Sequence, residues 1–212
     1  MKLSCPTFND GDRIPAAYAF GIPDTEAHLR LGDNLSPPLQ WDQVPDGTRS
    51  FALSCIDIDV PTRADDVNQE GREVPADLPR AEFVHWLIAD LPADCRSLAE
   101  GSCARGVVAG GKADPDGPEG SVQGLNDYTG WFEGDAEMAG RYLGYDGPCP
   151  PWNDALIHRY RFELLALDRD RLALASGFTL ADFRAATEGR VLARASLTGT
   201  YTLNPRLIQR SE

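Results

Sequence analysis

Phe51-Ala-Leu-Ser-Cys-Ile-Asp-Ile-Asp-Val-Pro61 is the stretch of this sequence that decides the fold. It is apolar, rich in strand-forming residues and closed by a proline, which is the pattern of a buried β-strand. Side chains alternate between the two faces of a strand, so Phe51, Leu53 and Cys55 share one face with Asp57 and Asp59. That face changes from apolar to acidic near the strand end, as expected where a core strand borders a small pocket.

Two further stretches have the same character. They are Phe83-Val-His-Trp-Leu-Ile88 and the longer segment from Leu156 to Asp168. By alternation, His85 shares a face with apolar neighbours in the first, and His158 and Tyr160 do so in the second. A histidine in an apolar strand is more often a core residue than a binding one. Here two of the chain's three histidines have this placement, so we expect them to join Asp57 and Asp59 in one pocket.

The rest of the chain predicts a mostly β protein with one helix near the C-terminus. A length of 212 residues suits a single domain, which we assign to residues 1–212. Thr179-Leu-Ala-Asp182 resembles a capping box, and apolar residues follow at helical spacing. These features predict a helix over about 179–194, weakened in its middle by Gly189. Thr200-Tyr-Thr-Leu203 is predicted to be a closing strand.

Composition excludes several classes of partner. Acidic residues outnumber basic ones 33 to 20, which gives a net charge of -13 and disfavours nucleic acid. No apolar run is long enough to cross a bilayer, and the N-terminus lacks the apolar run of a signal peptide. The five cysteines include no Cys-x-x-Cys pair, so neither a disulfide framework nor a zinc ribbon is predicted. We therefore expect a cytoplasmic protein with reduced thiols and no membrane insertion.

The candidate residues favour the binding of a small anion. Protonated histidines and a tyrosine hydroxyl donate hydrogen bonds to anions, and the two carboxylates could orient the imidazoles. Gly144-Tyr-Asp-Gly-Pro-Cys-Pro-Pro-Trp152 precedes the His158 strand. In it, Gly147 and Pro148 are expected to form a rigid rim whose backbone N–H groups approach the ligand.

Two enzymatic alternatives stay open at this point. Cys149 in the rim could be a nucleophile beside a histidine, although a buried inert thiol is the more frequent role for such a residue. His85, His158 and one aspartate match the two-histidine, one-carboxylate ligand set of a metal-dependent enzyme. The sequence contains no Gly-x-Ser-x-Gly, P-loop, dinucleotide or His-Glu-x-x-His motif. A binding protein without enzymatic activity and without a cofactor is therefore the leading interpretation.

Six segments together resemble the phosphatidylethanolamine-binding protein family, which includes the Raf kinase inhibitor protein and its bacterial relatives. In chain order they are Ser36-Pro-Pro-Leu-Gln-Trp41, Val44-Pro-Asp-Gly-Thr-Arg-Ser-Phe51, Asp57-Ile-Asp-Val-Pro61, His85-Trp86, Gly144-Tyr-Asp-Gly-Pro-Cys-Pro-Pro151 and His158-Arg-Tyr160. The family's usual first signature is Asp-Pro-Asp-Ala-Pro, in which Ile58 and Val60 of this chain replace the first proline and the alanine. Both acids and the final proline are retained.

The resemblance implies a compact sandwich of antiparallel β-sheets with a few peripheral helices. It also implies a pocket for a phosphate-like head group or acetate, and a Val60–Pro61 bond in the cis form. Some family members inhibit kinases or proteases and bacterial relatives are often dimers, so a partner enzyme and a homodimer are expected here. The matching pocket residues are Asp57, Asp59, Pro61, His85, Gly147, Pro148, His158 and Tyr160. The polar excursion at 62–82 and the Trp131-Phe-Glu-Gly-Asp135 region depart from the family. Both are expected to reshape access to the pocket, so no lipid preference is carried over.

Overall fold

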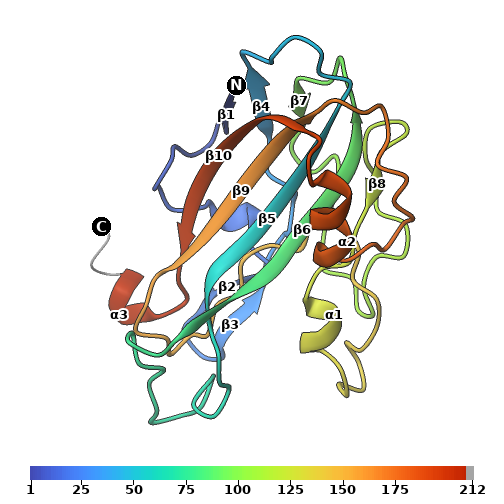
Figure 1. Cartoon of the computed structure of the whole chain (residues 1–212). Helices are drawn as coiled ribbons and strands as arrows, with labels where there is room; N and C mark the ends of the chain where they lie inside the picture. Colours follow the sequence, from blue (N-terminus) through green and yellow to red (C-terminus); the bar gives the residue numbers. More distant parts are fainter. Residues whose placement is uncertain (209–212) are drawn as a thin grey trace.

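A five-stranded antiparallel sheet forms the centre of the computed structural model, which describes residues 1–208 (Figure 1). Its strand order is β10-β9-β5-β6-β8. The three strands predicted from the sequence are the three in the middle. They are β9 (His158–Leu167), β5 (Ser50–Pro61) and β6 (Arg80–Pro92), flanked by β10 (Val191–Tyr201) and the short β8 (Val122–Gln123).

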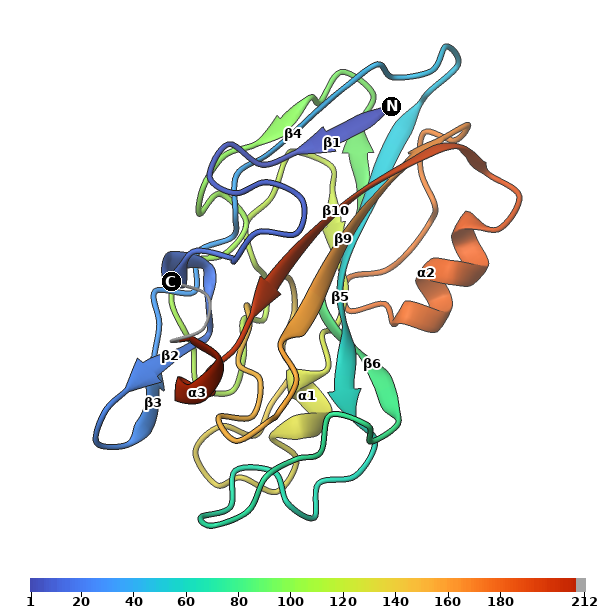
Figure 2. The same ribbon diagram turned by 90° about the vertical axis from the view of Figure 1, so that its left-hand side faces the viewer.

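A smaller sheet packs against one face of this central sheet. It consists of β1 (Lys2–Ser4), β4 (Leu39–Asp42) and β7 (Ser97–Leu98), in the order β1-β4-β7. The core lies between the two sheets and includes Leu3, Leu39, Trp41, Phe51, Leu53, Trp86 and Phe162. Figure 2 shows the small sheet and helix α2 (Leu180–Thr187) on opposite sides of the central sheet. The expected antiparallel β-sandwich is confirmed.

The second face of the central sheet is covered by α2 and the loop before it. Phe178 and Phe183 stack with ring centroids 6.1 Å apart and pack on Leu87, Leu165 and Leu167. The predicted capping box is present, because the Thr179 side chain accepts from the Asp182 N–H and the Asp182 carboxylate accepts from the Thr179 N–H.

The predicted extent of this helix, about 179–194, is too long. Helix α2 ends at Thr187, and Gly189 follows with a φ of 68°. This left-handed conformation ends a helix and is open to glycine at low cost. Val191, which fits the helical spacing in the sequence, instead begins β10 and pairs with Leu167. Of the closing strand predicted at 200–203, Thr200 and Tyr201 are the last two residues of β10, and Thr202 and Leu203 lie beyond its end.

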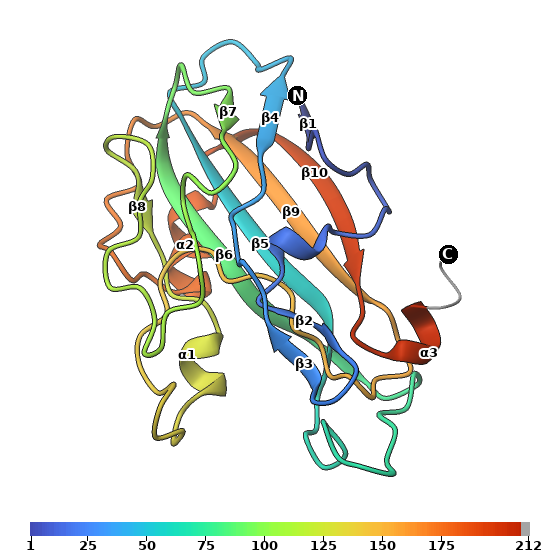
Figure 3. The same ribbon diagram turned by 180° about the vertical axis from the view of Figure 1, so that it is seen from behind.

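The hairpin of β2 (Gly21–Asp24) and β3 (His28–Leu31) lies near one end of the central sheet, together with helices α1 (Tyr128–Trp131) and α3 (Pro205–Ile208) (Figure 3). The 3-10 turn η1 (Ala16–Tyr18) precedes the hairpin in the chain. None of the helices within residues 1–208 is long and apolar enough to cross a membrane. Residues 209–212 of the predicted single domain lie outside the described residues.

The expected cis bond before Pro61 is wrong, since the Val60–Pro61 peptide is trans. The expectation assumed that the chain turns sharply away at this point. Instead, Val60 pairs with Ala81 and Pro61 with Arg80, so β5 continues as an extended strand. Extended pairing is compatible with the trans peptide, and the chain turns only in the loop that follows.

Candidate functional site

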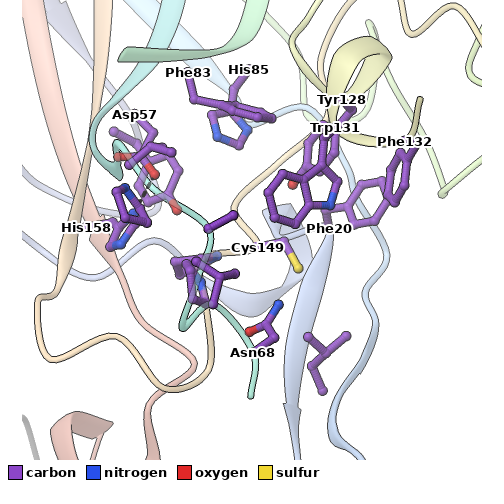
Figure 4. Close-up of a pocket in the computed structure, with 18 of the residues that line it drawn as sticks. Phe20, Asp57, Asn68, Phe83, His85, Tyr128, Trp131, Phe132, Cys149 and His158 are labelled. Atoms are coloured by element: carbon purple, nitrogen blue, oxygen red, sulfur yellow. Dashed lines mark hydrogen bonds and ion pairs between the residues drawn. The ribbon is translucent and has the colours of Figure 1, made fainter. Parts of the chain in front are cut away.

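A cavity of about 290 Å³ opens at the end of the central sheet, where β5, β6 and β9 meet the β2–β3 hairpin and helix α1 (Figure 4). Most of its wall is apolar. The polar exceptions cluster on the strands. The lining residues are Phe20, Leu29, Leu31, Asp57, Val60, Pro61, Ala64, Val67, Asn68, Phe83, His85, Tyr128, Trp131, Phe132, Met138, Cys149, Pro150, Pro151, His158 and Tyr160.

Strand pairing brings four of the predicted site residues together. Asp57 of β5 lies directly opposite Tyr160 of β9 and opposite Phe83 of β6. His85 is two residues beyond Phe83, and its ring lies 5.1 Å from that of Tyr160 at an interplanar angle of 71°. His158 is two residues before Tyr160 on the same face. Alternation along three neighbouring strands therefore assembles the polar end of the cavity. Pro61 and Cys149 also line the wall.

Asp59 does not line the cavity, although its parity in the sequence predicts that it does. The register between β5 and β6 shifts between Asp57 and Val60, and such an irregularity breaks the alternation of faces. The Asp59 carboxylate instead accepts from the backbone N–H of Arg159 at 2.9 Å and from its guanidinium at 2.8 Å. Burial acts to raise the pKa of Asp59, but the bonds from Arg159 outweigh it and lower that pKa.

Gly147 and Pro148 are also absent from the cavity wall, and their expected role as donors is corrected. The Gly147 N–H donates to Asn34 Oδ1 at 2.8 Å, and proline has no N–H to offer. The Pro148 carbonyl accepts from the Gly21 N–H at 3.1 Å. A Cβ atom at Gly147 would collide with the Tyr18 carbonyl. Glycine is therefore required here for close backbone packing of the rim, and its polar groups are already used within the protein.

His158 belongs to a buried chain of alternating charges. Its Nδ1 lies 2.7 Å from Asp57 Oδ2 and its Nε2 lies 3.1 Å from Asp154 Oδ2. Arg80 donates to both oxygens of Asp154, at 2.6 and 3.0 Å. Burial opposes a charge on the imidazole, but the bonds to Asp154 and Asp57 prevail and raise the pKa of His158 to about 9. The imidazolium uses both N–H groups on carboxylates, so neither is left for a ligand.

His85 differs from His158 in its protonation state and in its hydrogen bonds. Its Nδ1 lies 2.7 Å from the carbonyl oxygen of Asp146, so this nitrogen carries the proton and donates it. Burial lowers the pKa of His85, and the nearby charge of Asp57 offsets only part of that effect. At neutral pH the ring is therefore uncharged, and Nε2 carries a lone pair that can accept a hydrogen bond.

The position of His85 depends on a buried network that the sequence did not reveal. The Asp146 side chain is fully buried and accepts from Asn34 at 2.7 Å, from Lys112 at 2.6 Å and from Asn126 at 2.9 Å. These three donors come from segments far apart in the chain. They fix the Asp146 backbone, whose carbonyl orients His85.

Tyr160 contributes a buried hydroxyl that lies close to the Asp57 carboxylate but forms no hydrogen bond of normal geometry within residues 1–208. Its side chain is 1% exposed. Burial raises the pKa of Tyr160 well above its usual value, and the charge of Asp57, with a weak hydrogen bond to that carboxylate, acts in the same direction. The phenol therefore stays protonated. A buried polar group without a hydrogen bond of normal geometry is uncommon and is one mark of a binding site.

Neither enzymatic alternative gains support from the geometry. Burial raises the pKa of Cys149 to about 12, which keeps the thiol protonated and a poor nucleophile at neutral pH. Both ring nitrogens of His158 are already hydrogen-bonded to carboxylates, so neither is available as a base for the thiol. Among residues 1–208, no group of three or more histidine, cysteine, aspartate or glutamate side chains is arranged to hold a metal ion.

The sequence did not predict the aromatic wall of the cavity. Tyr128, Trp131 and Phe132 come from α1 and the residue that follows it, and they face the cavity with Phe20. Their spacing of three and four residues fits one side of a helical turn and could have suggested a common face. The surrounding glycines and acids hid this signal, because they made the segment resemble an irregular loop.

The 62–79 loop forms a further part of the cavity wall. It is held by hydrogen bonds from Asn153, which does not itself line the cavity. Asn153 Nδ2 donates to the carbonyl oxygens of Asp66, Gln69 and Arg72, at 2.8, 3.3 and 3.1 Å. The amide N–H of Asn68 in turn donates to Asn153 Oδ1 at 3.0 Å. One asparagine side chain therefore holds the loop that carries the lining residues Ala64, Val67 and Asn68.

Comparison with known proteins agrees with this architecture. The sequence model of the family described as phosphatidylethanolamine-binding protein matches residues 4–202. A UPF0098 protein of Methanothermobacter thermautotrophicus is 36% identical over 201 residues, covering 95% of this chain and 98% of the relative. The UPF0098 protein YbhB of Escherichia coli is 32% identical over 202 residues, covering 95% of this chain and all of the relative.

A solved structure of a member of this family has a similar fold. The crystal structure of Escherichia coli YbcL, described as a new member of the mammalian PEBP family, superposes with a TM-score of 0.67 at 25% sequence identity. The alignment covers 95% of this chain and 97% of YbcL.

Proposed function

Because the chain belongs to the phosphatidylethanolamine-binding protein family, we propose that it is a non-catalytic binding protein whose cavity holds the phosphate-type head group of a small ligand. The observation that carries this proposal is the buried hydroxyl of Tyr160, which lies near Asp57 but forms no hydrogen bond of normal geometry within residues 1–208. It lies beside His85, whose Nδ1 is bonded to the protein and whose Nε2 is left for a ligand.

The polar end is electrically balanced rather than positive. Asp57, His158, Asp154 and Arg80 carry two negative and two positive charges in one hydrogen-bonded chain. Within residues 1–208, no lysine or arginine lines the cavity. A doubly charged phosphate would therefore meet no free cation and would face the carboxylate of Asp57, which is unfavourable.

A singly protonated phosphate monoester matches the donors and acceptors better. Its ionised oxygen can accept from the Tyr160 hydroxyl, while its P–OH group donates to His85 Nε2 or to Asp57. The second pKa of a phosphate monoester is about 6, so the monoanion is present in useful amounts near neutral pH. The proposed ligand state is thus the monoanion. The sequence had suggested imidazolium donors for this role, but His158 is occupied and His85 is neutral at pH 7.

Calorimetric titration with methyl phosphate between pH 5.5 and 8.5 tests the proposal. Above pH 7 the fraction of monoanion falls about tenfold for each pH unit, and we expect the association constant to fall in proportion. An association constant that stays constant over this range, or absence of binding at pH 5.5, would contradict the proposal.

Tyr160→Phe tests the donor directly. The substitution removes one hydroxyl and keeps the packed ring. A hydrogen bond to a charged group contributes about 1.5–3 kcal/mol, so methyl phosphate should bind roughly 10- to 100-fold more weakly. Tyr142→Phe is the matched control, because the Tyr142 hydroxyl is bonded to the Met138 carbonyl and its ring lies outside the cavity wall. Equal binding by Tyr160→Phe and the wild-type protein would refute the role of this donor.

The names of the relatives compared above state no enzymatic activity, and we propose that this chain has none. A screen of ester, phosphoester and peptide substrates should give background rates. Turnover that disappears in Cys149→Ser would overturn this part of the proposal.

We also place the protein in the cytoplasm, a location that its five free cysteines suit. A partner enzyme and a homodimer stay predictions, to be checked by pull-down with and without phosphate and by sedimentation.

A further inference from the structure

The cavity has two chemically different halves. Asp57 and His158 lie on one side of it, and Tyr128, Trp131, Phe132 and Phe20 lie on the other, with Cys149 between them (Figure 4). The polar half accounts for the head group in the proposed function. The apolar half has no assigned occupant.

The apolar half is built largely from aromatic rings. Phe20 stacks on Tyr128 with centroids 4.5 Å apart and an interplanar angle of 16°, and Tyr128 stacks on Phe132 at 5.6 Å and 16°. Phe83 meets Tyr128 edge to face at 5.3 Å and 80°. These mutual contacts hold the rings in place, so a ligand would meet a pre-formed surface and little conformational entropy would be lost on binding.

The mouth of the cavity carries two of the most exposed large apolar residues of the described chain. Trp131 is 51% exposed and Leu31 is 54% exposed, and both line the cavity. They belong to separate elements, α1 and β3. Exposed apolar side chains gathered around a concave site mark a binding surface more often than isolated ones do.

The cavity has a volume of about 290 Å³, close to the lower end of the roughly 300–1,000 Å³ that small-molecule sites occupy. A phosphate group alone does not fill such a site, so there is room beside it for a further group of the ligand.

We propose that the apolar half of the cavity is a specificity subsite for a single aromatic ring, so that the ligand class is the aryl phosphate monoester. This inference rests on the proposed function for the head group and adds the identity of the group attached to it. An aromatic ring suits the site better than an alkyl group of equal size, because ring pairs interact favourably beyond the area that they bury. The ring would lie against the wall of Tyr128, Trp131 and Phe132, in the cavity that Leu31 also lines.

The test compares four probes by calorimetric titration at pH 6: methyl phosphate, cyclohexyl phosphate, phenyl phosphate and benzyl alcohol. We expect phenyl phosphate to bind roughly 30-fold more tightly than methyl phosphate, since burial of the ring removes apolar surface from water. Phenyl phosphate should also bind roughly 2- to 10-fold more tightly than cyclohexyl phosphate.

Two surface variants test whether the preference for phenyl phosphate over methyl phosphate arises in the apolar half of the cavity. Trp131→Ala and Leu31→Ala should each lower the ratio of the phenyl phosphate to the methyl phosphate association constant by roughly fivefold. Both residues are more than half exposed, so the fold should survive their truncation. Leu192→Ala is the matched control, because Leu192 is 45% exposed on β10 and lies outside the cavity wall. It should leave both association constants unchanged.

The outcomes separate this inference from the function on which it rests. Equal binding of phenyl and methyl phosphate would overturn the aromatic subsite and leave the head-group proposal intact. Equal binding of phenyl and cyclohexyl phosphate would overturn the preference for an aromatic ring. If benzyl alcohol binds in a manner that Trp131→Ala weakens while none of the phosphates binds, the apolar subsite is supported and the proposed phosphate head group is wrong.

Discussion

Replacing His158 by glutamine should destabilise the protein strongly at pH 6 and only slightly at pH 9.5. The imidazolium lies between Asp57 and Asp154, and these bonds raise its pKa to about 9. Glutamine has a similar reach and can donate to one carboxylate, but it carries no charge. The variant therefore removes the central cation of the buried chain and leaves the two carboxylates facing each other.

The magnitude follows from the pKa of His158. In the unfolded chain a histidine has a pKa of about 6.5, and the folded value of about 9 is higher. At about 1.36 kcal/mol per pKa unit the difference corresponds to about 3 kcal/mol of stabilisation. Because the folded pKa is raised, this stabilisation is complete below about pH 6.5. It is lost as the pH rises through about 9 and the folded protein also releases the proton.

Urea unfolding of the wild-type protein and His158→Gln at pH 6, 7.5 and 9.5 measures this effect. The difference in unfolding free energy should be about 3 kcal/mol at pH 6 and below about 1 kcal/mol at pH 9.5. Groups such as the cysteines titrate in both proteins, so their contributions cancel in the difference. A difference that stays constant across the three pH values would show that His158 is not an imidazolium in the folded protein.

Two further substitutions probe the supports of the site. Lys112→Met should lower the unfolding free energy by about 3 kcal/mol, because it leaves the fully buried Asp146 carboxylate without its cation. Lys2→Met, at an exposed position, is the control, and equal effects would refute the argument. Gly147→Ala should destabilise by roughly 1–3 kcal/mol or more, because its Cβ meets a backbone carbonyl. Gly130→Ala, where a Cβ meets nothing within 4 Å, should be tolerated; comparable melting temperatures would contradict the packing requirement.

The sequence was sufficient for the central sheet because its signal is local. Alternation of faces within β5, β6 and β9 needs only the residues of each strand, and it placed Asp57, His85, His158 and Tyr160 on one surface. That reasoning failed at Asp59, where the β5–β6 register shift rotates the side chain towards Arg159. A shift of this kind depends on how two strands pair and is not visible in either strand alone.

The remaining parts of the site depend on long-range contacts. Asp146 is ordered by Asn34, Lys112 and Asn126, which are separated from it by 112, 34 and 20 positions in the chain. Each is an ordinary polar residue within a loop, and nothing in its neighbourhood marks it as buried.

Helix α2 combines one end that the local sequence predicts with one end that depends on strand pairing. Its start was recognised from the local capping box, and its end was missed because Val191 fits helical spacing but pairs with Leu167 in a strand.

Local charge balance explains how an acidic chain can hold an anion. The net charge of -13 repels anions at long range, but salt screens exposed charges beyond about 8 Å under physiological conditions. Close to the cavity, the buried carboxylates already have cationic partners: Asp57 and Asp154 share His158, and Lys112 neutralises Asp146. What the ligand meets is therefore a surface of balanced charge with one donor, the Tyr160 hydroxyl, and two acceptors. Such a surface discriminates by protonation state, so it favours a monoanion over a dianion and gives binding that weakens as the pH rises.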